Sequence, residues 1–465
     1  MRHTLPISIC LLICLCLPMS LSFAQEGGLT ADYIKSLQTG LVLDPGTRAL
    51  MNAITGTDIK QLALNREIVN RYNDVFSLKL KTEGITDQKS SGRCWLFAGY
   101  NILRPAVMRK FNLAAFEFSQ NHTMFWDKLE KANFFLETII ATAKKDFDDR
   151  EIQALLTDPV PDGGWWNYYV SIIEKYGCVP KEIMPETINS EKTDRMNKIL
   201  NNLVCKAAAE LRAQVAQGRR PAEVRQYKES VLKDVYRLLV LHLGNPPREF
   251  TWRYKDKDEK VIEKTYTPQS FYKDAIAVNL QEYVTLVDHP EQPYNKHYDI
   301  HYCRNLIEAR DMNFINLSAE RLKEFAFTML QDSLPVWFAA DVQYNMDRDK
   351  GLMANDLFDY QTLYNLKLQM PKKERYLYKI SNPGHAMALI GVDIKEGKPQ
   401  KWLVENSWGK DIGKGGYWTM NDDWFNEYVF TVIVPQKYLP ADILNLLKTK
   451  PETLPAWDGM RSVFN

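Results

Sequence analysis

A single cysteine stands where a turn of small residues runs into an apolar segment. Cys94 follows Ser90, Ser91 and Gly92, and it opens the apolar run of residues 95–98. We predict that a helix begins here, so that Cys94 lies at an N-terminus, where unpaired N–H groups and the helix dipole stabilise a thiolate. The thiolate is the nucleophile in covalent catalysis. The alternative is a buried structural cysteine, the usual state of a lone Cys.

Three other residues, one near in sequence and two distant, would make this cysteine a catalyst. Gln88 carries an amide N–H that can aim, with the Cys94 backbone N–H, at a developing oxyanion. His385 lies at the start of a predicted strand in SNPGHAMALIGVD, and Asn406 lies at the end of another in KWLVENSWG. A thiol needs a base, and the imidazole needs a third group to orient it. These residues predict a Cys–His–Asn site.

The order Gln, Cys, His and then Asn-Ser-Trp-Gly resembles that of the papain-like cysteine peptidases. The local match around the cysteine is looser, because residues 91–95 are SGRCW where C-G-[SA]-C-[WY] is usual. A longer set of segments resembles the bleomycin hydrolase (aminopeptidase C) branch of that family, from about residue 80 to the C-terminus. The segments are 88–98, 117–120, 125–128, 162–164, 174–181, 246–247, 250–252, 335–338, 385–387, 406–409, 424–425 and 455–458.

The resemblance implies a fold and an activity. The fold class is α+β, a papain-like pair of a helical lobe and an antiparallel, barrel-like lobe, with a large, mainly helical insertion. The activity is that of a cysteine aminopeptidase, which removes N-terminal residues from peptides with a free N-terminus through a thioester acyl-enzyme. The branch assembles as a ring, so we expect a homo-hexamer. We predict these additional substrate-binding residues: Asp162, Gly163, Gly164, Trp408 and Asn465.

The C-terminal tail, residues 449–465, bears on the choice between two peptidase activities. In the resembled branch the C-terminus lies in the cleft, and its carboxylate faces the free amine of the substrate. Trp457 would then anchor the tail, and the α-carboxylate of Asn465 would pair with the ammonium group. Gly459 stands where the branch usually has proline, and residues 461–465 are bulkier than its small-residue ending. An endopeptidase with an open cleft is therefore the alternative.

Segment boundaries follow from these motifs. His385 lies 291 residues after Cys94, whereas papain-like enzymes have about 130–150 residues between them, so we predict an insertion. The predicted segments are 1–24, a signal peptide; 25–85, an N-terminal extension packed on the core; 86–190, the helical lobe with Cys94; 191–315, an inserted helical and hook subdomain; 316–448, the barrel-like lobe with His385 and Asn406; and 449–465, a tail entering the cleft.

The first residues are typical of a signal peptide. Arg2 precedes an apolar stretch, and residues 22–24 offer small side chains at the positions that a signal peptidase recognises. We expect cleavage after Ala24 and a periplasmic or secreted protein that has no membrane attachment. A membrane anchor is the alternative. Cleavage leaves four cysteines, too few for a disulfide scaffold, and secreted papain-like enzymes usually have a cysteine at the Ser91 position.

The charge balance and the motifs limit the partners. Lys and Arg number 59 against 58 Asp and Glu, so no net charge attracts nucleic acid. There is no Cys/His cluster at zinc spacing and no phosphate loop, and we expect no metal or other cofactor. Two further alternatives are a non-catalytic ring-forming binding protein, possibly for nucleic acid, and a transglutaminase-like Cys–His–Asp enzyme. The latter would leave Gln88 and Asn406 without a role.

Periodicity and turn residues predict the main elements. A helix from Cys94 should end or kink at Pro105, a second should begin after Ser119, and another should end at Gly177. Amphipathic patterns predict two helices in the insertion, followed by a hairpin near residues 250–266. A further helix is expected at 57–72, and strands are expected at 335–342, 386–393, 401–405 and 428–434.

Overall fold

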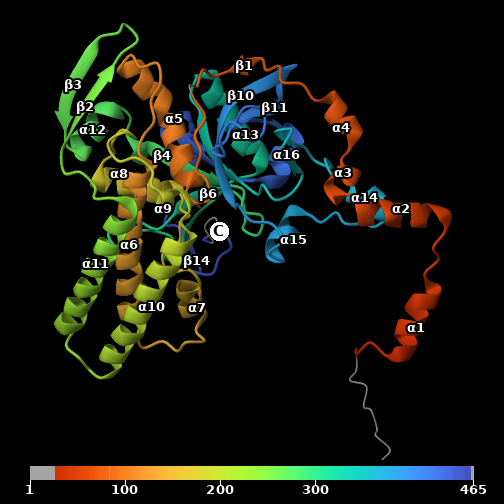
Figure 1. Ribbon diagram of the computed structural model, residues 1–465, viewed down its shortest axis with the longest axis horizontal. Coiled ribbons are helices and arrows are strands. Elements are labelled where there is room, and N and C mark those ends of the chain that lie inside the picture. The colour runs from red at the N-terminus through yellow and green to blue at the C-terminus, as the bar shows by residue number, and fades with distance from the viewer. Residues whose placement is uncertain (1–26, 83, 462–465) are drawn as a thin grey trace, which may run out of the picture. The chain divides into compact units, whose positions relative to one another are not determined.

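The computed structural model describes residues 27–82 and 84–461, which form two units divided between Ala63 and Leu64 (Figure 1). The first unit holds helices α1 (Ala31–Gly40), α2 (Pro45–Gly56) and α3 (Ile59–Ala63), and no residue of α1 or α2 is buried. The second unit opens with α4 (Arg66–Arg71). The single helix predicted for 57–72 is therefore two helices, because Asn65 caps α4 and separates it from α3. The predicted signal peptide and Asn465 lie outside the described residues.

A 12-stranded sheet is the centre of the second unit. Its strands follow the order β14-β5-β6-β4-β13-β7-β10-β11-β12-β9-β8, and β1 pairs with β10. Most neighbours are antiparallel, as expected for the barrel-like lobe. The strands are β1 (Leu78–Lys79), β4 (Tyr283–Val287), β5 (Lys296–Ile300), β6 (Asn313–Asn316), β7 (Val336–Ala340), β8 (Met346–Asp347), β9 (Leu352–Met353), β10 (His385–Lys395), β11 (Lys398–Glu405), β12 (Tyr417–Asn421), β13 (Val429–Pro435) and β14 (Glu452–Leu454).

The sheet begins earlier in the chain than the predicted barrel-like segment at 316–448. Strands β4, β5 and β6 lie within residues 283–316, and β4 pairs with β13 while β6 pairs with β4 and β5. Strands β5 and β6 are short and of mixed polarity, so their sequences carry a weak strand signal, whereas β4 consists of strand-forming residues that the sequence analysis did not assign. The inserted material that stands apart from the sheet is thus shorter than 191–315.

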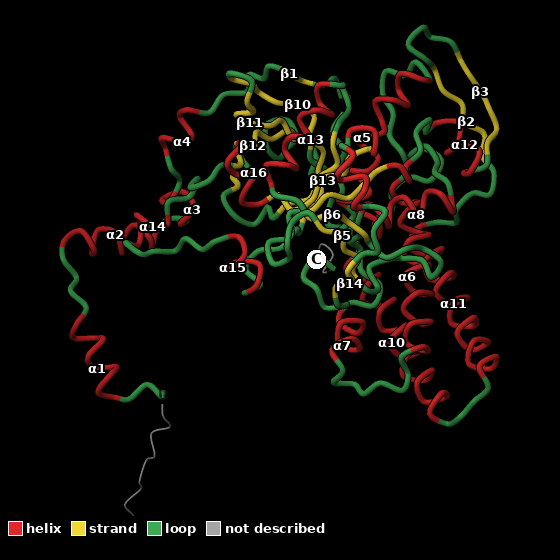
Figure 2. The backbone as a smooth tube through the Cα atoms, turned by 180° about the vertical axis from the view of Figure 1, so that it is seen from behind, coloured by secondary structure: helices red, strands yellow, loops and turns green. Residues whose placement is uncertain are grey.

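Helices build the other half of the second unit (Figures 1 and 2). Ser119 accepts from the His122 N–H and starts α6, and Gly177, at φ 70°, ends α8. The remaining elements are α5 (Cys94–Lys110), α6 (Gln120–Ala141), α7 (Arg150–Thr157), α8 (Trp166–Tyr176), α9 (Ile188–Glu191), α10 (Asp194–Ala216), α11 (Pro221–Leu243), β2 (Phe250–Lys255), β3 (Val261–Tyr266), α12 (Pro268–Ala275), η1 (Leu280–Glu282), α13 (Ala319–Gln331), α14 (Tyr360–Tyr364), α15 (Lys372–Leu377), α16 (Asp422–Tyr428), η2 (Gln436–Tyr438) and α17 (Ala441–Leu446).

The insertion forms a helical bundle and a hairpin. Helices α10 and α11 pack on each other and on α6, and the three run side by side in Figures 1 and 2. Each inserted helix buries one stripe, for example Leu200 and Val204 on α10 and Val231 and Val235 on α11. Strands β2 and β3 pair antiparallel as the predicted hairpin. The predicted helical pair and hairpin are confirmed.

Helix α5 carries the candidate nucleophile and is almost wholly buried. It begins at Cys94, as predicted, and packs against β10, β7 and α8. It continues through Pro105 to Lys110, so Pro105 does not end the helix, and the kink that the sequence offers as the other outcome stays a prediction. Pro105 removes one backbone hydrogen bond, but burial of the helix between the sheet and α8 stabilises its helical path.

A buried ion pair joins the two halves of the second unit. Arg104 on α5 contacts Glu405 at the end of β11 at 2.6 Å, and their side chains are 3% and 0% exposed. Arg104 also donates to the Gly84 carbonyl. Because Asn406 follows Glu405 directly, this pair fixes one candidate catalytic residue relative to the helix that begins at Cys94.

Replacing Glu405 with alanine should destabilise the protein strongly. The change leaves Arg104 buried without its counter-ion, which typically costs about 3–5 kcal/mol. The matched control is Glu452→Ala, which removes an exposed pair with Lys296 and should cost about 1 kcal/mol or less. Urea unfolding followed by tryptophan fluorescence measures both. Equal losses in the two variants would contradict the structural role of the buried pair.

Candidate active site

Cys94 lies where the first turn of α5 meets the first residues of β10. The backbone N–H groups of Ala386, Trp95 and Cys94 itself lie against its sulfur. Two of these groups belong to the helix N-terminus and the third follows His385 directly. The sulfur is therefore surrounded by donors that stabilise negative charge, and it lies next to the candidate base.

His385 and Asn406 form the predicted pair. The His385 Nε2 and the Asn406 Oδ1 are 2.8 Å apart. The same oxygen accepts from the Ser407 N–H at 2.7 Å, which identifies it as the acceptor. Nε2 therefore carries the hydrogen in the neutral ring, and Nδ1 is left as the basic nitrogen. Asn406 orients the imidazole, as the sequence predicts.

Trp408 covers the imidazole. Its ring stacks on His385 with centroids 4.6 Å apart, and the exposed Arg348 guanidinium lies 4.5 Å from the Trp408 ring centroid. The stacked indole covers one face of the imidazole that makes the His385–Asn406 hydrogen bond. The structure shows no substrate contact for Trp408, and its assignment as a substrate-binding residue stays a prediction.

Both reacting groups are buried, and burial shifts the pKa of each toward its neutral form. Burial raises the pKa of the Cys94 thiol to about 12, although the three N–H groups act to lower it. Burial also lowers the pKa of His385 to about 4, against the opposing effect of the hydrogen bond that His385 donates to Asn406. Cys94 is 1% exposed, so the helix N-terminus lies in a buried setting, where desolvation outweighs the N–H groups that stabilise a thiolate. The thiolate forms when the thiol passes its proton to the imidazole.

Gln88 is fixed between the two halves of the site. Its backbone N–H donates to the Ser407 carbonyl at 2.8 Å, and its Oε1 accepts from the Ser407 hydroxyl at 2.7 Å. Its Nε2 donates to the Ser91 carbonyl at 2.6 Å. An amide nitrogen has two hydrogens, so one bond to Ser91 fixes the group and leaves the second hydrogen for an oxyanion.

The other predicted substrate-binding residues lie beside the nucleophile. Gly164 packs against the Trp95 indole so closely that an added Cβ would lie 2.6 Å from the ring, which requires glycine there. The Gly163 carbonyl accepts from Lys131 at 2.6 Å. The Asp162 carboxylate is turned inward and bonded to protein groups. Asn465 lies outside the described residues.

Sequence reasoning missed several supporting residues. Arg93 is fully buried and pairs with Glu186 at 2.9 Å, and Ser407 holds Gln88. Arg348 sits over Trp408 from a loop far from either motif. The immediate neighbourhood of Cys94 and Asn406 in the sequence could have suggested Arg93 and Ser407, but no local signal points to Arg348 or Glu186.

A cavity of about 340 Å³ lies between the C-terminal tail and the loops that lead to His385 and Asp162, and none of the four candidate catalytic residues lines it. The C-terminal tail lines it with Ala456, Trp457 and Gly459, and the loop leading to His385 lines it with Ser381 and Asn382. The loop before Asp162 contributes Pro159 and Pro161. The described part of the tail therefore borders a hollow formed by the two loops that carry candidate site residues.

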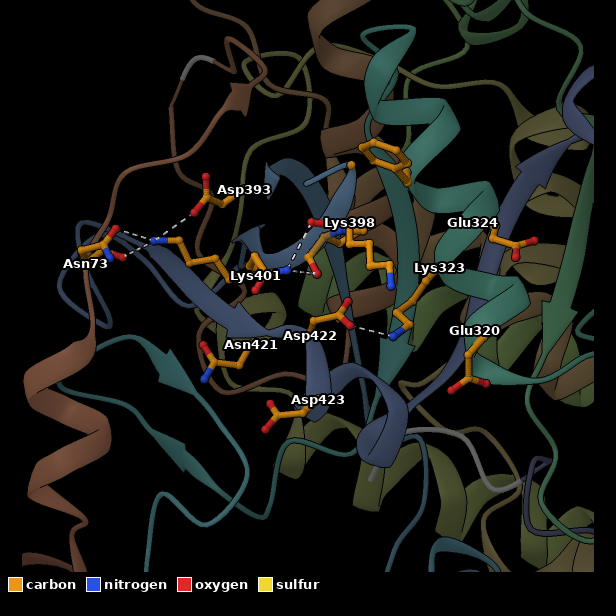
Figure 3. Close-up of a pocket in the computed structure, with 14 residues that line it drawn as sticks. Asn73, Glu320, Lys323, Glu324, Asp393, Lys398, Lys401, Asn421, Asp422 and Asp423 are labelled. Atoms are coloured by element: carbon orange, nitrogen blue, oxygen red, sulfur yellow. Dashed lines mark hydrogen bonds and ion pairs between the residues drawn. The ribbon is translucent and has the colours of Figure 1, made fainter. Parts of the chain in front are cut away.

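A second cavity, of about 940 Å³, contains none of the four candidate catalytic residues. Figure 3 shows two of its lysines bonded to neighbouring side chains, with Lys323 paired with Asp422 and Lys401 contacting Asn73 and Asp393. Across residues 27–82 and 84–461 no group of three or more His, Cys, Asp or Glu side chains is placed to hold a metal ion. Within the same residues no helix is long and apolar enough to cross a membrane.

Comparison with known proteins identifies the family. The Peptidase C1-like family matches residues 28–461. The chain is 37% identical to aminopeptidase C of Streptococcus thermophilus, covering 94% of this chain and 99% of that one. It is also 37% identical to human bleomycin hydrolase, covering 94% and 99%. A crystal structure of PepW from Lactobacillus rhamnosis HN001 superposes with a TM-score of 0.91 at 36% identity, covering 94% and 100%.

The chain belongs to the Peptidase C1-like family. The predicted papain-like α+β fold is confirmed, and so is the resemblance to the aminopeptidase C and bleomycin hydrolase branch.

Substitutions should rank the candidate catalytic residues. Cys94→Ala should lower peptide turnover by at least about 10⁴-fold, and His385→Ala should cost nearly as much, because groups that act as one unit are not additive. Asn406→Ala should cost less, since only ring orientation is lost. Steady-state kinetics measures turnover, and circular dichroism checks folding. Near-normal turnover in Cys94→Ala would overturn the assignment.

The depressed pKa of His385 sets the acid limit of activity. The imidazole is neutral and basic above pH about 4 and becomes protonated as the pH falls through that value. We therefore expect kcat/KM to fall only near pH 4, measured with far-UV circular dichroism to exclude unfolding. His301→Ala, at a histidine whose side chain is 42% exposed, is the control and should leave the profile unchanged. An acid limb centred near pH 6.5 would contradict a buried imidazole.

Proposed function

We propose that this protein is a cysteine aminopeptidase. The observation that carries the proposal is the placement of Cys94 at a helix N-terminus beside His385, with the imidazole held by Asn406 at 2.8 Å. Relatives named aminopeptidase C and bleomycin hydrolase share about 37% identity over nearly the whole chain.

The geometry gives each residue a role. His385 Nδ1 takes the thiol proton, and the Cys94 sulfur attacks the scissile carbonyl. Gln88 Nε2 and the Cys94 N–H donate to the resulting oxyanion, the charge that such donors stabilise most. The imidazolium then protonates the departing amine, leaving a thioester on Cys94. The neutral ring next activates a water molecule, which hydrolyses the thioester and frees the thiol.

We assign to the C-terminal tail the restriction of cleavage to the N-terminal residue of the substrate. The tail is held firmly up to Arg461. Strand β14 pairs with β5, and the Asp458 carboxylate accepts from the Tyr376 hydroxyl at 3.1 Å and from the Met460 N–H at 2.8 Å. Met460 is fully buried. The tail is thus anchored beside the 340 Å³ cavity, and we infer that the Asn465 carboxylate, four residues further along the chain, pairs with the substrate ammonium.

Deleting residues 463–465 tests this assignment. The truncated enzyme should lose activity on free-amine aminoacyl reporters and gain activity on N-blocked reporters, because both the ammonium partner and the obstruction are gone. Kinetics under reducing conditions give kcat/KM for each reporter. Asn465→Ala is the control, since it keeps the terminal carboxylate and should keep the preference. An unchanged preference in the truncated enzyme would favour the endopeptidase alternative.

Assembly and location are part of the proposal. A homo-hexamer follows from the resemblance alone, and sedimentation velocity with the purified full chain tests it. Export with cleavage after Ala24 follows from the apolar, small-residue leader, and N-terminal sequencing of the mature protein tests it. The substrates are peptides with a free N-terminus, with no metal, nucleic acid or membrane as a partner.

A further inference from the structure

Asp162 holds the chain on both sides of the nucleophile. It lies in the loop between α7 and α8. Its Oδ2 accepts from the Gly92 N–H at 3.1 Å, and its main-chain carbonyl accepts from the Trp95 indole at 2.8 Å. Gly92 is two residues before Cys94 and Trp95 is the residue after it, so one residue fixes both flanks of the reactive thiol.

The same carboxylate is bonded by two other segments. The Lys128 ammonium, on α6, lies 2.7 Å from Oδ1, and the Asn197 amide donates to Oδ1 at 2.8 Å. The Thr193 hydroxyl donates to Oδ2. Thr193 and Asn197 lie at the start of α10, in the insertion. Asp162 therefore connects the turn before Cys94 to both α6 and the inserted helical pair.

The carboxylate stays ionised in this position. Burial alone would raise its pKa, but the Lys128 ammonium and the hydrogen bonds from Thr193 and Asn197 outweigh burial and hold the pKa of Asp162 well below its usual range. A buried carboxylate with this many donors has no free lone pair directed to solvent, so it is poorly placed to bind substrate.

The loop around Asp162 is held by the same helix. Lys128 also donates to the Val160 carbonyl at 2.8 Å. Lys131, one turn further along α6, donates to the Pro161 carbonyl at 2.9 Å and to the Gly163 carbonyl at 2.6 Å. Two buried ammonium groups thus fix the backbone of residues 160–163, which leaves little room for Asp162 to move.

Residues near the start of the insertion also contact the turn before Cys94 directly. The buried Arg93 pairs with Glu186 at 2.9 Å, and the Ser90 N–H donates to the Glu191 carbonyl at 2.9 Å. Glu186 precedes α9 and Glu191 ends it, so both lie in the segment that leads into α10. All four cysteines in the described chain are free, so charge pairs and hydrogen bonds, rather than a disulfide among them, hold these segments together.

We propose that Asp162 is a positioning residue for catalysis, which fixes the Cys94 sulfur and its adjacent N–H donors through Gly92 and Trp95 and ties them to the start of α10. This positioning role takes the place of the substrate-binding role that the sequence predicts for Asp162. The proposal rests on Cys94 being the nucleophile. A shift of the turn by about 1 Å moves the sulfur away from the substrate carbonyl, and such a misplacement can cost about 10²-fold in rate.

The test compares kcat per active site between the wild-type protein and variants of Asp162 and its partners. Asp162→Asn should lower kcat by about 10²-fold with KM nearly unchanged, when activity is normalised to the fraction of Cys94 that an irreversible thiol reagent titrates. Thr193→Val and Asn197→Ala each remove one donor and keep the Lys128 pair, and each should lower kcat by about fivefold. Asp194→Asn, on the exposed first turn of α10, is the matched control and should leave kcat unchanged.

The outcomes separate this inference from the proposed function. A purely structural role would lower the titratable fraction and the melting temperature but leave the kcat per titrated site at the wild-type value, and that result would overturn the inference. If Asp162→Asn does not fold, Thr193→Val decides by the same criterion. Retained turnover in Cys94→Ala would instead overturn the proposed function itself.

Discussion

The docking of the N-terminus of α5 against the start of β10 is the contact on which the site depends. It brings backbone N–H groups from both elements to one sulfur. The Trp337 indole, on β7, donates to the Trp95 carbonyl at 3.2 Å and so holds the first turn of the helix against the sheet. Helix and sheet come from opposite lobes, and only their packing places the Cys94 thiol beside His385.

Buried charges maintain this alignment. Arg104 with Glu405, Asp162 with Lys128, and Arg93 with Glu186 each join segments that lie far apart in the sequence. Burying such pairs carries a desolvation cost of several kcal/mol per ion, so they contribute little net stability. These ion pairs make directional hydrogen bonds, which a purely apolar core lacks. We infer that they are retained because catalysis tolerates only small displacements of the thiol and imidazole.

Local signals made the main features predictable. The small-residue turn and apolar run predicted a helix start at Cys94, and strand patterns placed His385 and Asn406 at strand ends. The structure brings these residues together with Gln88. Helix α5 continues past Pro105 because burial of the helix outweighs the lost hydrogen bond. The pKa of the thiol could not be predicted from a helix N-terminus alone, since it depends on how completely β10 and its neighbours exclude water.

Contacts between residues far apart in the chain had no comparable signal in the sequence. The partners of Asp162 come from segments 31 to 70 residues away in sequence, and nothing local shows that its carboxylate turns inward. Strands β4 to β6 are short and pair with strands from other parts of the chain, including β13, so their membership in the sheet is a tertiary property. Sequence motifs predicted the reacting groups, whereas the residues that hold these groups in place are set by tertiary packing.

The most direct test of the account is to trap the covalent intermediate. The protein is mixed with an activated ester of an unblocked amino acid, quenched in acid within the first turnover and digested for mass spectrometry. The account predicts one aminoacyl group on Cys94 in the wild-type protein and none in Cys94→Ala. An adduct on Cys178, Cys205 or Cys303, or rapid turnover without any acyl adduct, would contradict it.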